Sequence, residues 1–193
     1  PYIQDALYFE ENPINSAIEY KEDMVFALNF GDEIQLADMN INLDARPYDM
    51  QKAYHPHGNV IYVNACGMQN MDHSVMLMEG GSCVLRNGKC LYQAPYFQED
   101  YALVDLASQK EDKAKPRSLL AALTMGIQQF DAQVFAGKLP WIVGMSGGLD
   151  SSVTAALLVY ALGKQRVYGY NLATRHNRDI TKSNARQEAQ ALG

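Results

Sequence analysis

The spacing of apolar and polar residues divides the chain into a strand-rich first part and a mixed second part. Short apolar runs that are rich in β-branched and aromatic residues, and that are separated by turn residues, are typical of strands. In the first part they predict strands over residues 24–28, 38–44, 60–65, 74–78, 82–85, 90–94 and 101–106. The Asn87-Gly88 pair predicts a type I′ hairpin turn between the fifth and sixth of these strands.

The second part alternates helical and strand patterns. Apolar residues at helical spacing predict an amphipathic helix over 118–135, which Gly137 ends. Four segments follow in the order strand, helix, strand, helix, over residues 141–143, 153–162, 167–172 and 181–192. This order implies a right-handed parallel crossover, which is the unit of a doubly wound α/β fold.

A charged stretch that contains a proline separates the two parts and predicts an interdomain linker. We therefore expect one domain over 1–107, a linker over 108–117 and a second domain over 118–193. Lys113, Lys115 and Arg117 are expected to form a solvated face of the linker.

Composition narrows the class of protein. The 193 residues are 48% apolar and 20% charged, which is typical of a globular chain. A net charge of −6 argues against a nucleic-acid partner. Without a membrane-length apolar run or a signal peptide, and with three cysteines at unpaired spacing, we expect a cytoplasmic protein. A start at Pro1 and a stop after a helical pattern suggest missing sequence at both ends. An incomplete sheet leaves exposed edges that can pair with other chains, so we expect a homo-oligomer.

The segment from Trp141 to Ser152 carries the candidate chemistry. It predicts a buried strand, a turn with two adjacent glycines and a helix that Ser151 or Ser152 caps. Exposed N–H groups that lead into a helix N-terminus form an anion site, and phosphate is the usual anion. The serine hydroxyls add donors, and the Asp150 carboxylate is suited to Mg²⁺ that bridges phosphate oxygens.

The same turn allows a second interpretation. Residues 144–148 satisfy G-x-S-x-G, the nucleophile elbow of α/β-hydrolases. An elbow serine needs an acid and a histidine later in the chain, and His176 is the single histidine after Ser146. A Walker A loop is excluded because G-x-x-x-x-G-K-[ST] does not occur.

The heptapeptide SGGLDSS resembles the PP-loop of the N-type ATP pyrophosphatases, whose pattern is SGGxDS. Those enzymes adenylate a substrate and release pyrophosphate. The resemblance implies an ATP and Mg²⁺ site with Asp150 at the metal, and it assigns the ATP phosphates to Ser146, Gly147, Gly148, Leu149, Asp150, Ser151 and Ser152. Residues 167–174 resemble the V-x-G-x-x-M-P-S stretch of NAD synthetases, with Leu172 and Ala173 in place of Met and Pro. This implies adenosine near Leu172 and Thr174.

The first part resembles the late strands of nitrilase-type amidase domains. Four motifs carry this resemblance, namely Tyr62-Val63-Asn64-x-x-Gly67, Gly80-Gly81-Ser82, Asn87-Gly88 and Phe97-x-Glu99-Asp100. An amidase domain followed by a PP-loop resembles glutamine-dependent NAD synthetase. The implied fold is α/β, with a doubly wound parallel-sheet ATP pyrophosphatase part (adenine nucleotide alpha hydrolase-like) after part of a nitrilase-type α/β sandwich.

The implied activity is that of a carbon–nitrogen ligase with glutamine as the amido donor. Nicotinic acid adenine dinucleotide is amidated to NAD through an adenylate, with ammonia from glutamine hydrolysis. Amidases of this type use a Glu-Lys-Cys set whose cysteine precedes the Tyr-Val-Asn stretch, and no cysteine precedes Cys66 here. Cys66, Cys83 and Cys90 are expected to be buried and unreactive, so no catalytic residue is assigned. Two alternatives stay open: a GMP-synthetase-like PP-loop amidotransferase, and a truncated nucleotide-binding piece without turnover.

Overall fold

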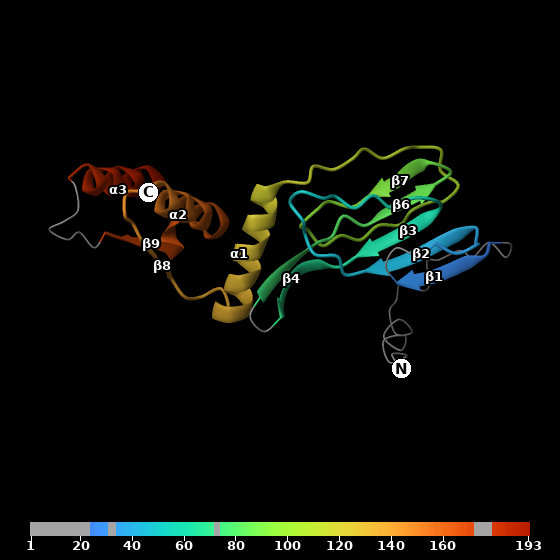
Figure 1. Cartoon of the computed structure of the whole chain (residues 1–193), viewed down its shortest axis with the longest axis horizontal. Coiled ribbons are helices and arrows are strands. Elements are labelled where there is room, and N and C mark those ends of the chain that lie inside the picture. The colour runs from blue at the N-terminus through green and yellow to red at the C-terminus, as the bar shows by residue number, and fades with distance from the viewer. Residues whose placement is uncertain (1–23, 31–33, 72–73, 172–178) are drawn as a thin grey trace.

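The computed structural model describes residues 24–30, 34–71, 74–171 and 179–193. These residues form a strand-rich part and a mixed α/β part, and helix α1 lies between the two (Figure 1). None of the helices in the described ranges is both long and apolar enough to cross a membrane.

The strand-rich part is built on a five-stranded sheet in the order β1-β2-β3-β6-β7. Its first three strands are parallel and its last two pairings are antiparallel. Two further strands, β4 and β5, form a separate antiparallel ladder. The bounds are Phe26–Phe30 for β1, Met39–Asp44 for β2, Val60–Asn64 for β3, Cys66–Met71 for β4, Ser74–Glu79 for β5, Cys83–Arg86 for β6 and Lys89–Gln93 for β7.

Most of the predicted strands are confirmed, and the hairpin between β6 and β7 has the predicted turn. Asn87 and Gly88 have φ angles of 52° and 75°, as both central residues of a type I′ turn require. Strand β4 was not predicted, because its sequence CGMQNM lacks the β-branched residues that favour a strand.

The strand predicted over 101–106 is wrong, because this segment has irregular structure. The carbonyl of Leu106 accepts a hydrogen bond from the Arg86 side chain at 2.8 Å. Further along, the Asp112 N–H donates to the Cys90 carbonyl at 2.8 Å, and the Asp112 carboxylate accepts from the Gln93 N–H at 3.1 Å. Asp112 thus occupies backbone groups of β7 with which a further strand would have to pair, so residues 101–106 do not add a strand there.

The solvated face predicted for the linker is wrong at Arg117. Its guanidinium lies 2.5 Å from the carboxylate of buried Glu79 and 4.5 Å from the centre of the Tyr48 ring. A buried carboxylate needs a charged partner, and Arg117 supplies it. Lys115 is more exposed and pairs with Asp112 at 3.6 Å. Whether 108–117 separates two domains stays a prediction.

Helix α1, Leu119–Phe135, packs on both parts of the molecule. The Ser118 side chain caps it by accepting from the Ala121 N–H, and Ala136 ends it in the left-handed conformation. Toward the strand-rich part, the Gln129 side chain accepts a hydrogen bond from the Met68 N–H of β4. Toward the other side, the Gln128 amide donates to the Ala161 carbonyl at 2.9 Å.

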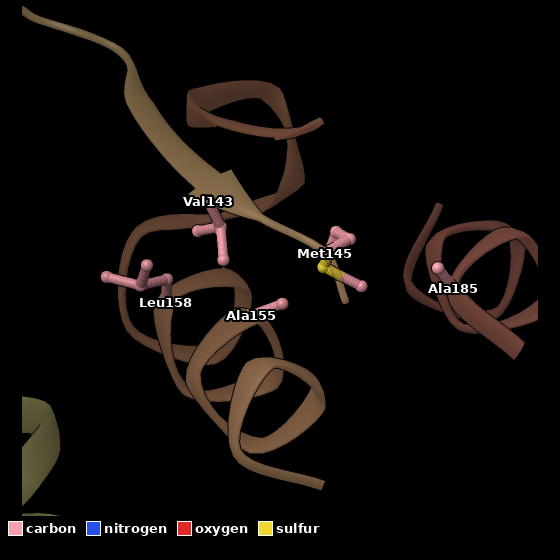
Figure 2. Packing of buried hydrophobic residues seen from close by; sticks show 5 residues of the cluster. All are labelled: Val143, Met145, Ala155, Leu158 and Ala185. Carbon is pink, nitrogen blue, oxygen red and sulfur yellow. The ribbon is translucent and has the colours of Figure 1, made fainter. Parts of the chain in front are cut away.

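The α/β part consists of two parallel strands joined by a helix, which confirms the predicted crossover. Its core holds Val143 and Met145 at the end of the first strand, Ala155 and Leu158 on the joining helix, and Ala185 on the last helix (Figure 2). The elements are β8 (Trp141–Gly144), α2 (Leu149–Leu162), the 3-10 helix η3 (Lys164–Arg166), β9 (Val167–Tyr170) and α3 (Asp179–Leu192).

Candidate functional site

The glycine turn leaves the sheet at the carboxyl end of β8. Val143 and Met145 point into the core and anchor the strand just before the turn (Figure 2). The Met145 N–H donates to the Tyr170 carbonyl at 2.7 Å, so the contact between β8 and β9 extends one residue past β8. Gly169 permits this approach, because a Cβ there would lie 3.0 Å from the Met145 Cγ. The position of Ser146 is therefore fixed by core packing.

The two glycines of the turn have different roles. Gly147 has a φ of 76°, which a residue with a side chain rarely adopts. Gly148 has a φ of −103° and is the N-cap of α2. Because residues with side chains adopt this φ readily, glycine matters here only because it leaves the backbone without a side chain. A Cβ at Gly148 would lie 3.4 Å from the Ser146 Oγ, on an exposed part of the turn. The turn thus needs one glycine for its bend and leaves the backbone uncovered at the other.

The predicted cap at Ser151 or Ser152 is wrong. Helix α2 begins at Leu149, four residues earlier than the pattern predicted, and its N-cap Gly148 makes no side-chain cap bond. Ser151 and Ser152 lie in the first turn, where their hydroxyls donate to the Gly148 carbonyl at 3.0 and 2.7 Å. Serine hydroxyls readily form such local backbone bonds, which let both residues enter the helix.

Three residues of the turn form a small hydrogen-bonded cluster. The Ser146 and Ser151 hydroxyls lie 3.1 Å apart, and the Ser146 N–H donates to the Ser151 Oγ at 3.2 Å. The Gly148 N–H approaches the Ser146 Oγ at 3.3 Å. These bonds hold the turn in one shape, while the N–H groups of Leu149 and Asp150 in the first helical turn have no acceptor within the helix. The first turn of α2 therefore presents backbone N–H donors beside Ser146 and Gly148.

Asp150 is exposed in the first turn of α2, where a negative charge interacts favourably with the helix dipole. Its side chain makes no hydrogen bond or ion pair with another described residue. The described ranges hold no group of three His, Cys, Asp or Glu residues that could bind a metal alone. One carboxylate fits Mg²⁺ when phosphate oxygens and water supply the other ligands.

The hydrolase interpretation receives no support from the geometry of the turn. Among the residues that the structure describes, the non-glycine residues with positive φ are Asn87, Phe97 and Ala136, and Ser146 is not one of them. The sharp bend falls on Gly147, and the Ser146 hydroxyl contacts Ser151. His176, and the predicted adenosine contacts Leu172 and Thr174, lie outside the described residues. The last residue of β9, Tyr170, does lie beside the turn through its bond to Met145.

A buried acid at the opposite end of the two strands was not predicted. Asp131 of α1 is 3% exposed and binds the Arg166 guanidinium through both oxygens, at 2.6 and 2.8 Å. It also accepts from the Trp141 indole N–H at 2.8 Å. These contacts fix the starts of β8 and β9, and the Arg166 hydrogen bonds lower the pKa of the Asp131 carboxyl. The sequence held no signal for a pairing over 35 positions.

The thiols of the strand-rich part lack the features of a nucleophile. Burial raises the pKa of Cys83 to about 12. Burial is also the main cause that raises the pKa of Cys66 and of Cys90, which are half-buried. A reactive cysteine needs a lowered pKa, because the thiolate is the attacking form. The prediction of full burial is confirmed for Cys83 alone, and the three pKa directions agree with unreactive thiols.

Comparison with known proteins gives a family for the second part and relatives for most of the chain. The NAD synthase family model matches residues 119–193. A glutamine-dependent NAD(+) synthetase of Synechocystis sp. is 32% identical over 181 residues, or 82% of this chain and 31% of the relative. An NH(3)-dependent NAD(+) synthetase of Pyrobaculum aerophilum is 48% identical over 58 residues, or 30% of this chain and 20% of the relative.

A solved structure matches the fold of nearly the whole chain. It is a glutamine-dependent NAD+ synthetase from Acinetobacter baumannii in complex with adenosine diphosphate, with a TM-score of 0.71 and 24% identity over 91% of this chain and 38% of that chain. The chain spans about a third of the length of the curated glutamine-dependent relatives that it matches over most of its own length. Residues 119–193 therefore match the NAD synthase family, and most of the chain is similar to part of the glutamine-dependent NAD(+) synthetases.

Proposed function

We propose that this chain binds ATP at residues 146–152 and takes part in the amidation of nicotinic acid adenine dinucleotide to NAD. The observation that carries the proposal is the open turn between β8 and α2. There, uncovered backbone at Gly148, two first-turn N–H groups and an exposed carboxylate meet at a helix N-terminus. Phosphates bind at such ends because N–H dipoles and the helix dipole both favour negative charge.

Each residue of the turn has a role in this proposal. The N–H groups of Leu149 and Asp150 and the hydroxyls of Ser146, Ser151 and Ser152 donate to phosphate oxygens. Gly147 and Gly148 let the phosphates approach the backbone. The Asp150 carboxylate holds Mg²⁺, which neutralises phosphate charge. Phosphoryl and nucleotidyl transfer needs mainly positioned and neutralised oxygens, so no protein nucleophile is required here.

The reaction has two steps. The nicotinate carboxylate attacks the α-phosphorus of ATP, and the bond to the bridging oxygen breaks with release of pyrophosphate. Ammonia then attacks the carbonyl carbon of the adenylate, AMP leaves, and the nitrogen loses a proton to give the amide of NAD. The relatives are NAD(+) synthetases, which supports this choice over a GMP-synthetase-like reaction. The ADP complex belongs to the Acinetobacter baumannii protein and supports a nucleotide site here, with adenosine near Leu172 and Thr174.

The arrangement of the chain forms part of the proposal. Residues 1–107 are the amidase-like part, 108–117 the linker and 118–193 the synthetase part. Three free thiols suit a reducing compartment such as the cytoplasm. Glutamine hydrolysis is the proposed source of ammonia in the full reaction. No cysteine precedes Cys66 in this sequence and burial raises the pKa of each of its three thiols, so free ammonia is supplied to test the synthetase part. The same observation favours a second candidate, a nucleotide-binding piece without turnover.

A product assay tests the proposal. The folded chain is given nicotinic acid adenine dinucleotide, ATP and Mg²⁺ with either ammonium or glutamine, and NAD and pyrophosphate are measured. We expect both products with ammonium and neither with glutamine. Asp150→Ala is expected to abolish them, whereas Glu111→Ala, which removes an exposed acid from the 108–117 stretch, leaves them unchanged. ATP binding without NAD would favour the second candidate, and absence of ATP binding would contradict both.

A further inference from the structure

A glycine inside β9 has no conformational reason to be glycine. The φ of Gly169 lies outside the left-handed range, so residues with side chains can adopt its backbone conformation. Glycine inside a strand lowers stability, because it loses more conformational freedom on folding than other residues and brings no side chain to pack. Such a glycine often marks a place where another group approaches the backbone closely. The group that approaches Gly169 is the side chain of Met145.

Met145 has little room to move away from Gly169. It is 4% exposed, and Figure 2 shows its side chain in the core between Ala155 of α2 and Ala185 of α3, which are themselves buried. A Cβ on Gly169 would lie 3.0 Å from the Met145 Cγ. Carbon atoms in favourable contact are about 3.5–4.0 Å apart, so an alanine at position 169 would displace Met145 by roughly 0.5 Å or more. Because the core is closely packed, part of this displacement falls on the Met145 backbone.

The backbone of Met145 leads directly into the turn at residues 146–152. The Met145 N–H donates to the Tyr170 carbonyl at 2.7 Å, which ties it to β9. The next N–H, that of Ser146, lies in the planar peptide group that starts at the Met145 carbonyl, and it donates to the Ser151 Oγ at 3.2 Å. A shift of Met145 therefore changes the direction of this N–H. It also moves the Ser146 hydroxyl, which lies 3.1 Å from the Ser151 hydroxyl.

We propose that Met145 and Gly169 are positioning residues for the ATP site. Met145 holds the start of the turn in place, and glycine at position 169 provides the space in which Met145 fits. This inference rests on the proposed function, which assigns the turn to the ATP phosphates. Binding groups must be held within about 0.5 Å of their productive positions, and a side chain at position 169 would cause a displacement of that size. A side chain there therefore weakens ATP binding without touching the nucleotide.

A double-mutant cycle on ATP affinity tests the contact between the two residues. Calorimetric titration with ATP and Mg²⁺ is carried out on the wild type, Gly169→Ala, Met145→Ala and the double variant. Gly169→Ala is expected to weaken binding about tenfold in the wild type, which is within the coupling range of residues in contact. In the Met145→Ala background the same change is expected to weaken binding less than about twofold, because the shortened side chain no longer meets the added Cβ.

Leu158→Ala is the matched control for a loss of stability alone. Leu158 belongs to the same core as Met145 and is 6% exposed, but it lies in the later half of α2, away from the turn. Both truncations remove buried apolar atoms and are expected to lower the midpoint of urea unfolding by similar amounts. Leu158→Ala is nevertheless expected to bind ATP like the wild type. A loss of affinity as large as that of Gly169→Ala would overturn the proposal, because general destabilisation would then explain both.

Amide chemical shifts of the isotope-labelled chain, measured without ATP, separate this proposal from the proposed function. Gly169→Ala is expected to shift the amide signals of Ser146 and Gly148, and Leu158→Ala is expected to leave them in place. Unchanged signals or wild-type ATP affinity in Gly169→Ala would overturn the positioning role, and so would equal losses of affinity in the two backgrounds of the cycle. A wild type that does not bind ATP would contradict the proposed function, and the amide signals would still decide whether Gly169 positions the turn.

Discussion

Two turns of this molecule contain adjacent glycines, and they differ in what surrounds them. Gly80 and Gly81 follow β5 in the strand-rich part, and both are buried with φ angles of 65° and 69°. A Cβ on Gly81 would clash with the Tyr96 ring, and one on Gly80 would lie 3.2 Å from Cys66. At the other turn, Gly148 is exposed and a Cβ would find its nearest neighbour, the Ser146 Oγ, at 3.4 Å.

The difference shows that a double glycine does not define a function by itself. In the first turn, glycine is needed because neighbouring side chains occupy the space. In the second, the space is open, one glycine has ordinary φ, and a helix N-terminus follows. The first turn is explained by packing, whereas the second leaves uncovered backbone that packing does not require. Only the second turn therefore leaves backbone groups open to a ligand.

The largest expected effect is on the packed turn. Gly81→Ala forces a side chain into a left-handed conformation and against Tyr96, so the free energy of unfolding is expected to fall by roughly 2–4 kcal/mol. Urea unfolding followed by circular dichroism measures it. A loss below about 0.5 kcal/mol, the usual range of a surface change, would show that Tyr96 moves aside and that the turn is not closed.

A smaller effect on stability is expected at Asp131, which contacts the starts of β8 and β9, at the end opposite the open turn. Asp131→Asn keeps an oxygen for Trp141 but removes the charge and one of the two Arg166 contacts, so we expect a loss of roughly 1–2 kcal/mol. The pKa of Asp131 lies below its ordinary value of 3.8. The ion pair with Arg166 therefore stabilises the fold fully above pH 3.8, and this stabilisation is lost as pH falls through the lowered pKa.

Unfolding of the wild type and of Asp131→Asn at neutral pH and in the acid range below about pH 4 provides the check. The difference between the two proteins should shrink in acid. A difference that is constant with pH would mean that the ion pair with Arg166 is not its source.

The smallest expected effect on stability is at the open turn. Gly148→Ala is expected to change the free energy of unfolding by less than about 0.5 kcal/mol, because φ is ordinary and the added carbon makes only normal contact. The same urea titration as for Gly81→Ala gives this value. Equal losses for the two variants would remove the distinction between a packed and an open glycine turn.

Local patterns were sufficient for much of the fold, and they gave the glycine turn as the candidate site. The Asn87-Gly88 hairpin, the helix that begins after Ser118 and the parallel crossover from β8 to β9 follow from spacing and turn chemistry alone. The glycine turn was found because its serines and Asp150 are contiguous in the sequence.

The failures arose where distant segments decide the structure. Arg117 is partly buried because it pairs with Glu79, 38 positions away in the sequence. Asp131 pairs with Arg166 over a similar separation of 35 positions. Strand β4 forms because β5 and α1 pack on it, although its own sequence is a weak strand former. The start of α2 was missed because hydroxyl bonds to the Gly148 carbonyl let serines lie inside the helix, where the pattern predicted them as caps.

The most direct test of the central claim is calorimetric titration of the folded chain with ATP and Mg²⁺. We expect one ATP per chain, with affinity reduced about tenfold or more in Gly148→Ala and in Asp150→Ala. Glu111→Ala should bind like the wild type, and omission of Mg²⁺ should weaken the wild type far more than Asp150→Ala. Wild-type affinity in both Gly148→Ala and Asp150→Ala would contradict the account, because phosphates would then bind elsewhere.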